Sequence, residues 1–275
     1  MEPGILPDRI GGLGNQLFIV VAGYICSKVH RVPLYILDMV CEAHQTVKED
    51  YKKSIFSFFG IHIESCESSY KSYSPEGFSP WSPQDISPGT KLSSYFQYYP
   101  PILPYEEEIR SLILKGLDFY LKSLSQLYTG SYAFVHIRRG DYLQHTYMHY
   151  VQPIEYYKRA ISLLDDSVQI IVFSDDIDWV ESQEYFKEPR FNIQRNLNEL
   201  ETLSLMSLCK EGAICSNSTF SWWGAYLGTH AQRNKVIVPE EWINSSYFDT
   251  ESWLTCPSGA KVPNLFPKEW IILSN

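Results

Sequence analysis

Two adjacent arginines, Arg138 and Arg139, directly follow an apolar segment at residues 131–137 that is typical of a buried β-strand. An arginine carries a permanent positive charge and a planar fork of donors that fits a phosphate group. The sequence HIRRGD at 136–141 therefore predicts an anion-binding site at the end of a strand. On these residues alone, two surface arginines, or an ion pair between Arg138 and Asp141 that only shapes the turn, explain the pattern equally well.

A second candidate is SNSTFSWWG at 216–224, which lies between a short predicted strand and the start of a helix. Hydroxyl groups and backbone N–H groups at a helix N-terminus bind anions. The alternative is an ordinary cap by Ser218 in front of a buried aromatic helix, which is the commoner use of such residues. Asn217 also begins a formal glycosylation sequon, which we discount because its neighbours are predicted to be buried.

Two weaker candidates also follow predicted strands. GGLGNQ at 11–16 comes after a short strand, and its glycines allow close backbone approach to a ligand, but the spacing is not that of a GxGxxG dinucleotide motif. SDD at 174–176 ends another strand. Its carboxylates would accept hydrogen bonds from a ribose or a base edge, or they would only cap the next helix.

Hydrophobic periodicity predicts an alternation of strands and helices that places these turns. We expect strands at 7–10, 33–39, 94–99, 131–137, 168–174, 213–216 and 235–239. We expect helices at 17–29, 104–127, 153–164, 198–212, with a capping box of Asn198 and Glu201, and 219–227. Residues 67–91, rich in serine, proline and tyrosine, match no regular element and are predicted to form a long loop.

Strand–helix–strand order predicts an α/β fold of two Rossmann-like lobes, each with a parallel sheet, facing a central cleft. We place an N-terminal lobe at 1–128 and a C-terminal lobe at 129–257. The remaining segment, 258–275, is predicted to pack back on the N-terminal lobe. Ligands in such folds lie outside the carboxyl ends of the strands, where all four candidate motifs fall.

Composition excludes several classes of protein. Of the 275 residues, 44% are hydrophobic and 20% charged, so the chain can bury a core, and its net charge of −9 argues against nucleic-acid binding. The longest apolar stretch, 17–26, is about half of what a membrane-spanning helix needs, so no transmembrane segment is expected. The first nine residues do not resemble a signal peptide. We therefore expect a cytoplasmic protein, or a protein of the Golgi lumen if the sequence is part of an anchored chain.

The six cysteines show no CxxC spacing, and no histidine stands in a zinc-finger register with them. Scattered cysteines in a chain of this length are typically buried free thiols. We therefore predict no metal site and free thiols at Cys26, Cys41, Cys66, Cys209, Cys215 and Cys256.

Taken in order, GGLGNQLF, SYFQYY, HIRRGDY, LSLMSLCK and SNSTFSWWGAYL resemble the motifs of the α-1,2-fucosyltransferases of glycosyltransferase family 11. The resemblance runs from about residue 11 to 273, and FPKEWIIL is similar to the closing segment of the family. The HxR and TFS elements are shared more loosely with α-1,6- and protein O-fucosyltransferases.

The resemblance implies a GT-B fold and an enzyme that uses GDP-β-L-fucose as its donor. Fucose would pass with inversion to the 2-hydroxyl of a galactose-containing glycan acceptor, giving an α-1,2 linkage, and no metal ion or other cofactor would be required. Without a metal, protein groups must neutralise the charge that develops on the leaving diphosphate. By family likeness Arg138 contacts the β-phosphate and the glycosidic oxygen, and Arg139 supports it or builds the wall of the site.

The resemblance also implies which residues bind the two substrates. The donor-binding residues are His136, Arg138, Arg139, Asp175, Asn217, Ser218, Thr219 and Phe220, with His136 and Asp175 on the guanosine. Gly14, Asn15 and Gln16 would line the acceptor side. Arg138 and Asp141 are the candidate catalytic residues, with Asp141 as the base for the acceptor hydroxyl; its alternative role is a structural partner for an arginine.

Three alternatives remain. A fucosyltransferase of another linkage, α-1,6 or protein O-linked, shares part of the motifs, but the full SNSTFSWWGAYL favours the α-1,2 family. A non-catalytic carbohydrate-binding protein would not need a phosphate site. A nicotinamide-dependent oxidoreductase is disfavoured by the glycine spacing at 11–16.

Overall fold

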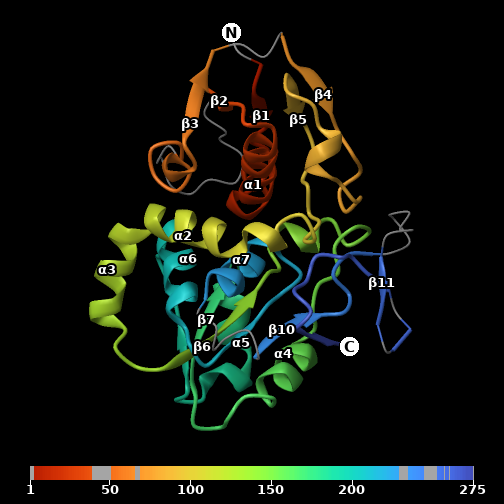
Figure 1. The fold of residues 1–275 in the computed structure, drawn as a ribbon. Helices are drawn as coiled ribbons and strands as arrows, with labels where there is room; N and C mark the ends of the chain where they lie inside the picture. Colours follow the sequence, from red (N-terminus) through yellow and green to blue (C-terminus); the bar gives the residue numbers. More distant parts are fainter. Residues whose placement is uncertain are drawn as a thin grey trace. The chain divides into compact units, whose positions relative to one another are not determined.

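The computed structural model describes residues 3–38, 51–65, 69–228, 235–244, 253–256, 258–259 and 261–274. The chain divides into two compact units, and Figure 1 colours the ribbon by residue number from the N-terminus to the C-terminus. Unit 1 comprises Met1–Phe119 and Pro263–Leu265, and unit 2 comprises Tyr120–Val262 and Phe266–Asn275. Of the segment 258–275, expected to pack on the N-terminal lobe, residues 263–265 belong to unit 1 and the others to unit 2, where Ile271–Leu273 pair with residues 237–239. The cleft expected between the lobes stays a prediction.

Unit 1 is built on a five-stranded parallel sheet with the order β3-β2-β1-β5-β4. The strands are β1 (Ile5–Pro7), β2 (Leu34–Leu37), β3 (Ile61–Glu64), β4 (Lys71–Tyr73) and β5 (Thr90–Leu92). The helices are α1 (Leu13–His30), η1 (Ser57–Phe59), η2 (Pro83–Asp85), η3 (Leu103–Tyr105) and α2 (Glu106–Gly116), followed at the boundary by α3 (Asp118–Leu127).

Helix α1 lies in the core of unit 1, with Leu17, Phe18 and Ile25 fully buried. It can approach the sheet closely because residue 23 is glycine. A Cβ at Gly23 would stand 2.9 Å from Pro7 Cγ and 3.0 Å from Leu34 Cδ1. This packing fixes the start of α1, and with it GGLGNQ, at the carboxyl end of β1.

Three predictions of local structure in unit 1 are wrong. Residues 94–99 form no strand, because Phe96 takes a left-handed backbone conformation (φ 51°) and packs edge-on against Trp81. The segment predicted as a loop at 67–91 holds β4 and η2 and runs into β5, and these three-residue elements are too short for a periodic signal. The helix expected at 104–127 is two helices that meet at Leu117, beside the close approach of Gly116 to the backbone of Ile55.

Unit 2 is built on a six-stranded parallel sheet with the order β13-β10-β9-β6-β7-β8. The strands are β6 (Tyr132–Ile137), β7 (Gln169–Ser174), β8 (Phe191–Ile193), β9 (Gly212–Ile214), β10 (Val236–Pro239) and β13 (Ile271–Leu273). The helices are η4 (Asp141–Leu143), α4 (Ile154–Ile161), α5 (Ile177–Ser182), η5 (Glu184–Lys187), α6 (Glu199–Leu208) and α7 (Thr219–Leu227). A separate antiparallel pair joins β11 (Leu254–Thr255) to β12 (Lys261–Val262).

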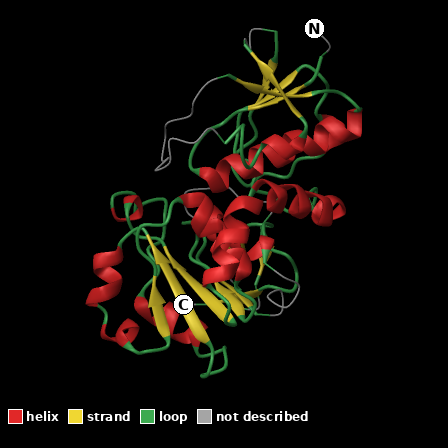
Figure 2. Cartoon of the chain, turned by 90° about the vertical axis from the view of Figure 1, so that its left-hand side faces the viewer, coloured by secondary structure: helices red, strands yellow, loops and turns green. Residues whose placement is uncertain are grey.

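Helices cover both faces of the sheet of unit 2, as Figure 2 shows. On one face the side chains of Val135 and Val172 join a buried cluster with Tyr157 of α4 and Val180 of α5. On the other face His136 lies 5.8 Å from the ring of Phe220 in α7. The predicted α/β architecture with parallel sheets is therefore confirmed.

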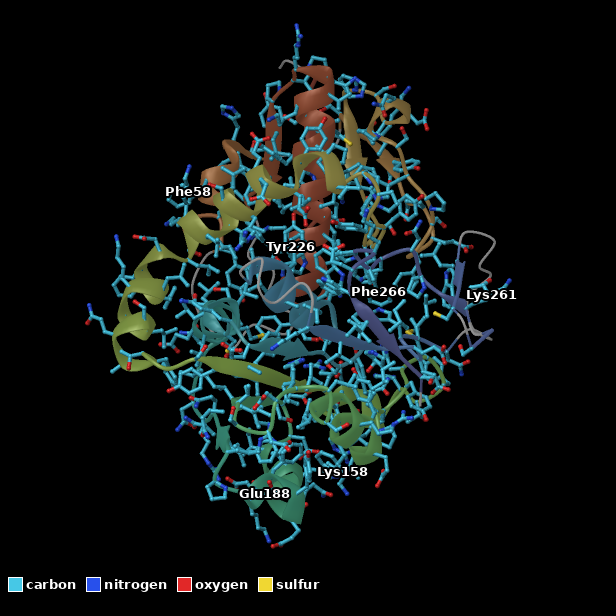
Figure 3. All side chains as sticks on the ribbon, turned by 60° about the horizontal axis from the view of Figure 1, so that its bottom comes forward. Phe58, Lys158, Glu188, Tyr226, Lys261 and Phe266 are labelled. Carbon is cyan, nitrogen blue, oxygen red and sulfur yellow. The ribbon has the colours of Figure 1, made fainter. Side chains whose placement is uncertain are left out.

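Helix α7 is nearly all buried, and Gly224 is what lets α6 pack against it. A Cβ at Gly224 would stand 2.5 Å from Met206 Sδ. Figure 3 shows the side chains of this unit; Tyr226 and Phe266 are buried, whereas Lys158 and Glu188 are exposed. The N-terminus of α7 is thereby held in place by the packing of its body.

The capping box predicted at the start of α6 is confirmed: the side chain of Asn198 accepts from the N–H of Glu201 at 2.9 Å, and the Glu201 carboxylate accepts from the N–H of Asn198. Buried free thiols are confirmed at Cys26, Cys209, Cys215 and Cys256, whereas positions 41 and 66 lie outside the described residues. Among the described helices, none combines the length and the apolar character needed to cross a membrane.

Candidate active site

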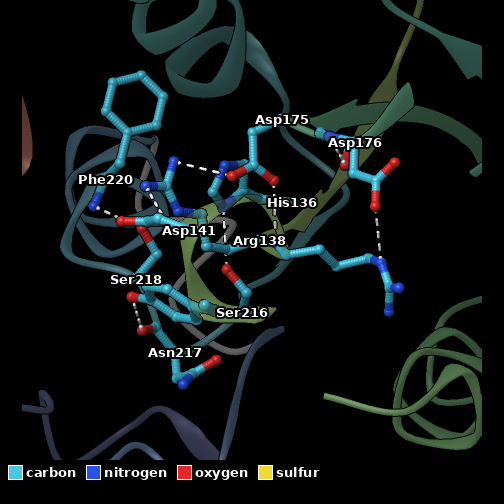
Figure 4. A network of polar contacts seen from close by, with 12 residues as sticks. His136, Arg138, Asp141, Asp175, Asp176, Ser216, Asn217, Ser218 and Phe220 are labelled. Atoms are coloured by element: carbon cyan, nitrogen blue, oxygen red, sulfur yellow. Dashed lines mark hydrogen bonds and ion pairs between the residues drawn. The ribbon is translucent and has the colours of Figure 1, made fainter. Parts of the chain in front are cut away.

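Three neighbouring parallel strands, β9, β6 and β7, end at one edge of the sheet of unit 2. In register, Ile137 of β6 pairs with Ser174 of β7, and Val135 pairs with Ile214 of β9. The segments after these strands therefore converge. They carry HIRRGD, SDD and SNST, the three motifs that the sequence places in this half of the chain, and Figure 4 shows their side chains in one polar network.

Arg138 is held between two carboxylates. Its Nη2 donates to Asp141 Oδ1 at 2.7 Å, and its Nη1 lies 3.0 Å from Asp175 Oδ2. The guanidinium also lies 5.4 Å from the centroid of the Tyr142 ring. Contacts on several sides fix the orientation of this cation, and its side chain is still 29% exposed. The ion pair that the sequence offered as an alternative for Asp141 is therefore present.

Asp175 organises the turn after β6 as well as Arg138. Its Oδ1 accepts a hydrogen bond from the backbone N–H of Arg139 at 2.9 Å. Residue 140 has to be glycine for this arrangement, because a Cβ there would stand 2.5 Å from Asp175 Oδ2. The carboxylate is thus occupied by the arginine loop, and its predicted contact with a guanosine stays a prediction.

Arg139 has a different set of partners from Arg138. Its Nε donates to Asp176 Oδ2 at 3.0 Å, and its guanidinium lies 4.1 Å from the centroid of the Trp179 ring. Asp176 is at the same time the N-cap of α5, because its Oδ1 accepts from the N–H of Trp179. Arg139 is therefore fixed to the start of α5, which favours the wall-building role among the two that the sequence left open.

The turn 216–218 leads into α7 and supplies the second half of the site. The Ser218 Oγ accepts from the N–H of Phe220 at 3.3 Å, so Ser218 is the N-cap, as predicted. Ser221 stiffens the turn by donating its hydroxyl to the carbonyls of Ser216 and Ser218. The first turn of α7, which includes Thr219, holds no acidic residue, so its N–H dipoles leave a positive potential at this end.

His136 is a neutral, buried member of the network. Its Nδ1 lies 3.0 Å from Ser216 Oγ. Burial, followed by the charge of Arg138, lowers the pKa of His136 to about 3. The ring therefore adds no positive charge at neutral pH, and its predicted contact with a guanosine stays a prediction.

Asn217 anchors two other segments to this turn. Its Nδ2 donates to the carbonyls of Tyr150 and Trp242, at 2.9 and 3.0 Å, and its backbone carbonyl accepts from the hydroxyl of Tyr142 at 3.0 Å. The side chain is 3% exposed. Its geometry is that of a structural anchor, and its predicted contact with the donor stays a prediction.

The acceptor-side candidates lie in unit 1, at the start of α1. Gln16 is fully buried and its Nε2 donates to the carbonyl of Gly11 at 2.9 Å, while Asn15 Oδ1 accepts from Gln97 Nε2 at 3.1 Å. Gly14 directly precedes them in the first turn of α1 and is buried. The glycine turn is thus a built, hydrogen-bonded corner, and its part in acceptor binding stays a prediction.

Chemically, this end of unit 2 combines the oriented guanidinium of Arg138, the carboxylates of Asp141 and Asp175, and the N-terminus of α7. Such a set can hold an anion whose charge grows during a reaction. Within the part of the chain that the structure describes, no three His, Cys, Asp or Glu side chains come close enough together to hold a metal ion.

Sequence reasoning missed two residues of this network, Tyr142 and Trp179. Tyr142 directly follows HIRRGD, and Trp179 stands three positions after the cap Asp176. Both were concealed among the many aromatic residues of a chain that has 20 tyrosines and 7 tryptophans. For Tyr142 the available signal was its place four positions after Arg138, whereas Trp179 stands 40 positions after Arg139 and had no such signal.

Comparison with known proteins identifies the family to which the chain is similar. The family model described as "Glycosyl transferase family 11" matches residues 105–255. The chain is similar to the O-antigen biosynthesis glycosyltransferase WbnK of Escherichia coli, with 29% identity over 89% of this chain and 97% of that protein. It is also similar to an α-1,2-colitosyltransferase of Escherichia coli, with 26% identity over 90% of this chain and 94% of that protein.

Among solved structures, the fold resembles that of the α-1,6-fucosyltransferase NodZ co-crystallised with GDP. The TM-score is 0.51 at 14% identity, over 83% of this chain and 93% of that chain. At this identity the likeness concerns the fold alone, and it confirms the expected α/β architecture of the GT-B type.

Proposed function

The chain belongs to glycosyl transferase family 11, and from this premise we propose that it transfers L-fucose from GDP-β-L-fucose to the 2-hydroxyl of a galactose-containing glycan. The product would be an α-1,2 linkage, formed with inversion at the anomeric carbon. The observation that carries the proposal is the guanidinium of Arg138, held by Asp141 and Asp175 beside the N-terminus of α7.

In the proposed reaction the acceptor oxygen attacks the anomeric carbon of fucose, and the bond from that carbon to the β-phosphate oxygen breaks. GDP leaves with the electron pair, so negative charge grows on the diphosphate. Arg138, together with the first turn of α7, supplies positive charge where this negative charge develops. Because the guanidinium is oriented before the donor arrives, little reorganisation is needed in the transition state.

The proton of the acceptor hydroxyl needs a base, and we assign it to Asp141. Its Oδ1 accepts from Arg138, and its side chain is 38% exposed. A carboxylate suits a proton that leaves late, because the acceptor hydroxyl becomes acidic only when the new bond is largely formed. Because Asp141 and Arg138 are hydrogen-bonded, the position of the base would be coupled to that of the phosphate-binding guanidinium.

The linkage and the sugar are supported to different degrees. The α-1,2 linkage has the support of a relative whose name states that linkage. The same name supports a second candidate function, in which colitose is transferred instead of fucose. A direct comparison decides between them: purified chain is given GDP-fucose or nucleotide-linked colitose with one galactoside acceptor, and the product is read by mass spectrometry and linkage analysis.

The proposal predicts acceptor-dependent release of GDP. With GDP-fucose and a galactoside, GDP should form faster than with GDP-fucose alone, and the product should gain one fucosyl group. A carbohydrate-binding protein without catalytic activity would give no GDP in either case. A fucosylated product linked at another position would support GDP-fucose as the donor but would overturn the α-1,2 assignment.

We also propose that no metal ion is required, because protein groups supply the positive charge at the leaving group. Turnover in excess EDTA should equal turnover in buffer alone, and added Mg²⁺ or Mn²⁺ should not raise it. Raising the salt concentration should weaken GDP binding, since partly exposed charges are screened. Loss of turnover in EDTA, restored by a divalent ion, would refute this proposal.

Gly140→Ala tests the carboxylate that orients Arg138. The new methyl group collides with the end of a flexible side chain, Asp175 Oδ2, so Asp175 should move while the fold survives. We expect the melting temperature to change little and turnover to fall by about tenfold, the scale of one lost hydrogen bond to a charged group. Gly77→Ala is the matched control, because a Cβ there meets nothing within 4 Å. Equal turnover in the two variants would show that Asp175 does not orient the cation.

A further inference from the structure

Tyr142 touches both halves of the candidate site. Its ring lies 5.4 Å from the guanidinium carbon of Arg138, and its hydroxyl donates to the carbonyl of Asn217 at 3.0 Å. Arg138 belongs to the segment after β6, whereas Asn217 lies in the turn before α7. Tyr142 is therefore a physical link between the cation and the helix N-terminus that would share one diphosphate.

The tyrosine itself is held firmly. It is 9% exposed, and its ring stacks on that of His149 with centroids 4.1 Å apart and an angle of 5° between the planes. Burial raises the pKa of the Tyr142 hydroxyl, so this group stays protonated and donates throughout the working pH range. A ring fixed in this way cannot follow a guanidinium that drifts, so it limits where Arg138 can lie.

We propose that Tyr142 is a positioning residue that sets the distance between Arg138 and the 216–218 turn. The inference rests on the proposed function, because it gives the two groups a shared diphosphate to hold. Tyr142 acts through Arg138 and needs no contact with the substrate itself.

The chain offers a matched control in Tyr156. Like Tyr142 it is a buried tyrosine whose hydroxyl donates to a backbone carbonyl, in this case that of Cys215, directly before the 216–218 turn, at 2.7 Å. It stands on α4, and its ring neighbour is Tyr157. Removing either hydroxyl costs a comparable buried hydrogen bond, but only the hydroxyl of Tyr142 belongs to a ring beside Arg138.

The experiment compares kcat, donor KM and melting temperature for Tyr142→Phe, Tyr142→Leu and Tyr156→Phe. We expect Tyr142→Phe to lower kcat by about threefold to tenfold, the scale of one lost neutral hydrogen bond. Donor KM should stay within about twofold, because the lost bond positions a group that acts in the transition state. Tyr142→Leu, which also removes the ring beside the cation, should lower kcat by about thirtyfold or more. Tyr156→Phe should lower the melting temperature about as much as Tyr142→Phe does, but its kcat should stay within about twofold of the wild type.

A double variant shows whether the effect passes through Arg138. In the Arg138→Lys background, Tyr142→Phe should change kcat by less than about twofold, because the guanidinium that Tyr142 positions is already lost. Multiplying losses would overturn the inference, as would a Tyr142→Phe enzyme with wild-type kcat or an equal loss in Tyr156→Phe. If the wild type itself released no GDP from GDP-fucose, the proposed function would fall, and the inference with it.

Discussion

Arg138→Lys is expected to reduce turnover by at least about 10²-fold while the protein stays folded, the usual scale for removing one transition-state donor. Lysine keeps the positive charge but has one ammonium group in place of the planar fork. It cannot reach Asp141 and Asp175 in the geometry that arginine adopts, with its two terminal nitrogens 2.7 and 3.0 Å from the two carboxylates. The cation would lose its fixed orientation toward the leaving diphosphate.

Arg139→Lys is the matched control, one residue along the same loop. Arg139 pairs with Asp176 and stacks on Trp179, so a lysine there keeps an ion pair at the start of α5 and leaves Arg138 in place. Turnover should fall much less than in Arg138→Lys. Steady-state kinetics with thermal melts of both variants make the test. Equal turnover in two folded variants would remove Arg138 from the catalytic role.

The location of the site could be predicted from the sequence, because it depends on regular structure. The strands that end in His136–Ile137, Ser174 and Ile214 are continuous apolar runs, and parallel strands bring their carboxyl ends to one edge. The cap at Ser218 could also be predicted, because it is a local interaction between residues two apart. Apolar runs and helix caps are both local patterns, and a local pattern can be recognised in the order of the residues alone.

The partners of the two arginines could not be predicted in the same way. Arg138 and Arg139 are identical neighbours in the sequence, yet one reaches Asp175 and the other Asp176. That choice depends on the register of β6 against β7, and no pattern within either strand encodes it. The ring of Tyr142 lies beside Arg138 because of the one-turn helix η4, which is too short to produce a periodic pattern in the sequence.

The errors in unit 1 have a related cause. SYFQYY at 94–99 has the aromatic composition of a strand, but tertiary packing decided the outcome. Phe96 is buried by taking a positive φ, and the N–H of Tyr99 bonds to the carbonyl of Asn264, far away in the chain. Strand propensity describes a side chain that fits a half-buried surface, and other buried surfaces accept the same residues.

Ser218→Ala and Thr219→Val are expected to weaken GDP binding by about tenfold or more each, because a hydrogen bond to a charged group is worth about 1.5–3 kcal/mol. The Ser218 oxygen accepts from Phe220 N–H, which leaves its own proton available for a phosphate oxygen. Binding of guanosine, which lacks the phosphates, should hardly change in either variant. Calorimetry with both ligands, alongside thermal melts, makes the measurement.

The cap itself has to be separated from phosphate binding. Loss of an N-cap costs about 1 kcal/mol of folding stability, so Ser218→Ala should melt lower even if no phosphate binds at this turn. Asn198→Ala is the matched control, because it removes the cap of α6 and touches none of the site residues described above. It should lower stability to a similar degree and leave GDP affinity alone, while Thr219→Val, which leaves the Ser218 cap in place, should lower GDP affinity. If the binding of GDP and of guanosine weakened in parallel, the site would have collapsed. If only the melting temperature fell, Ser218 would act as a helix cap and would not bind phosphate.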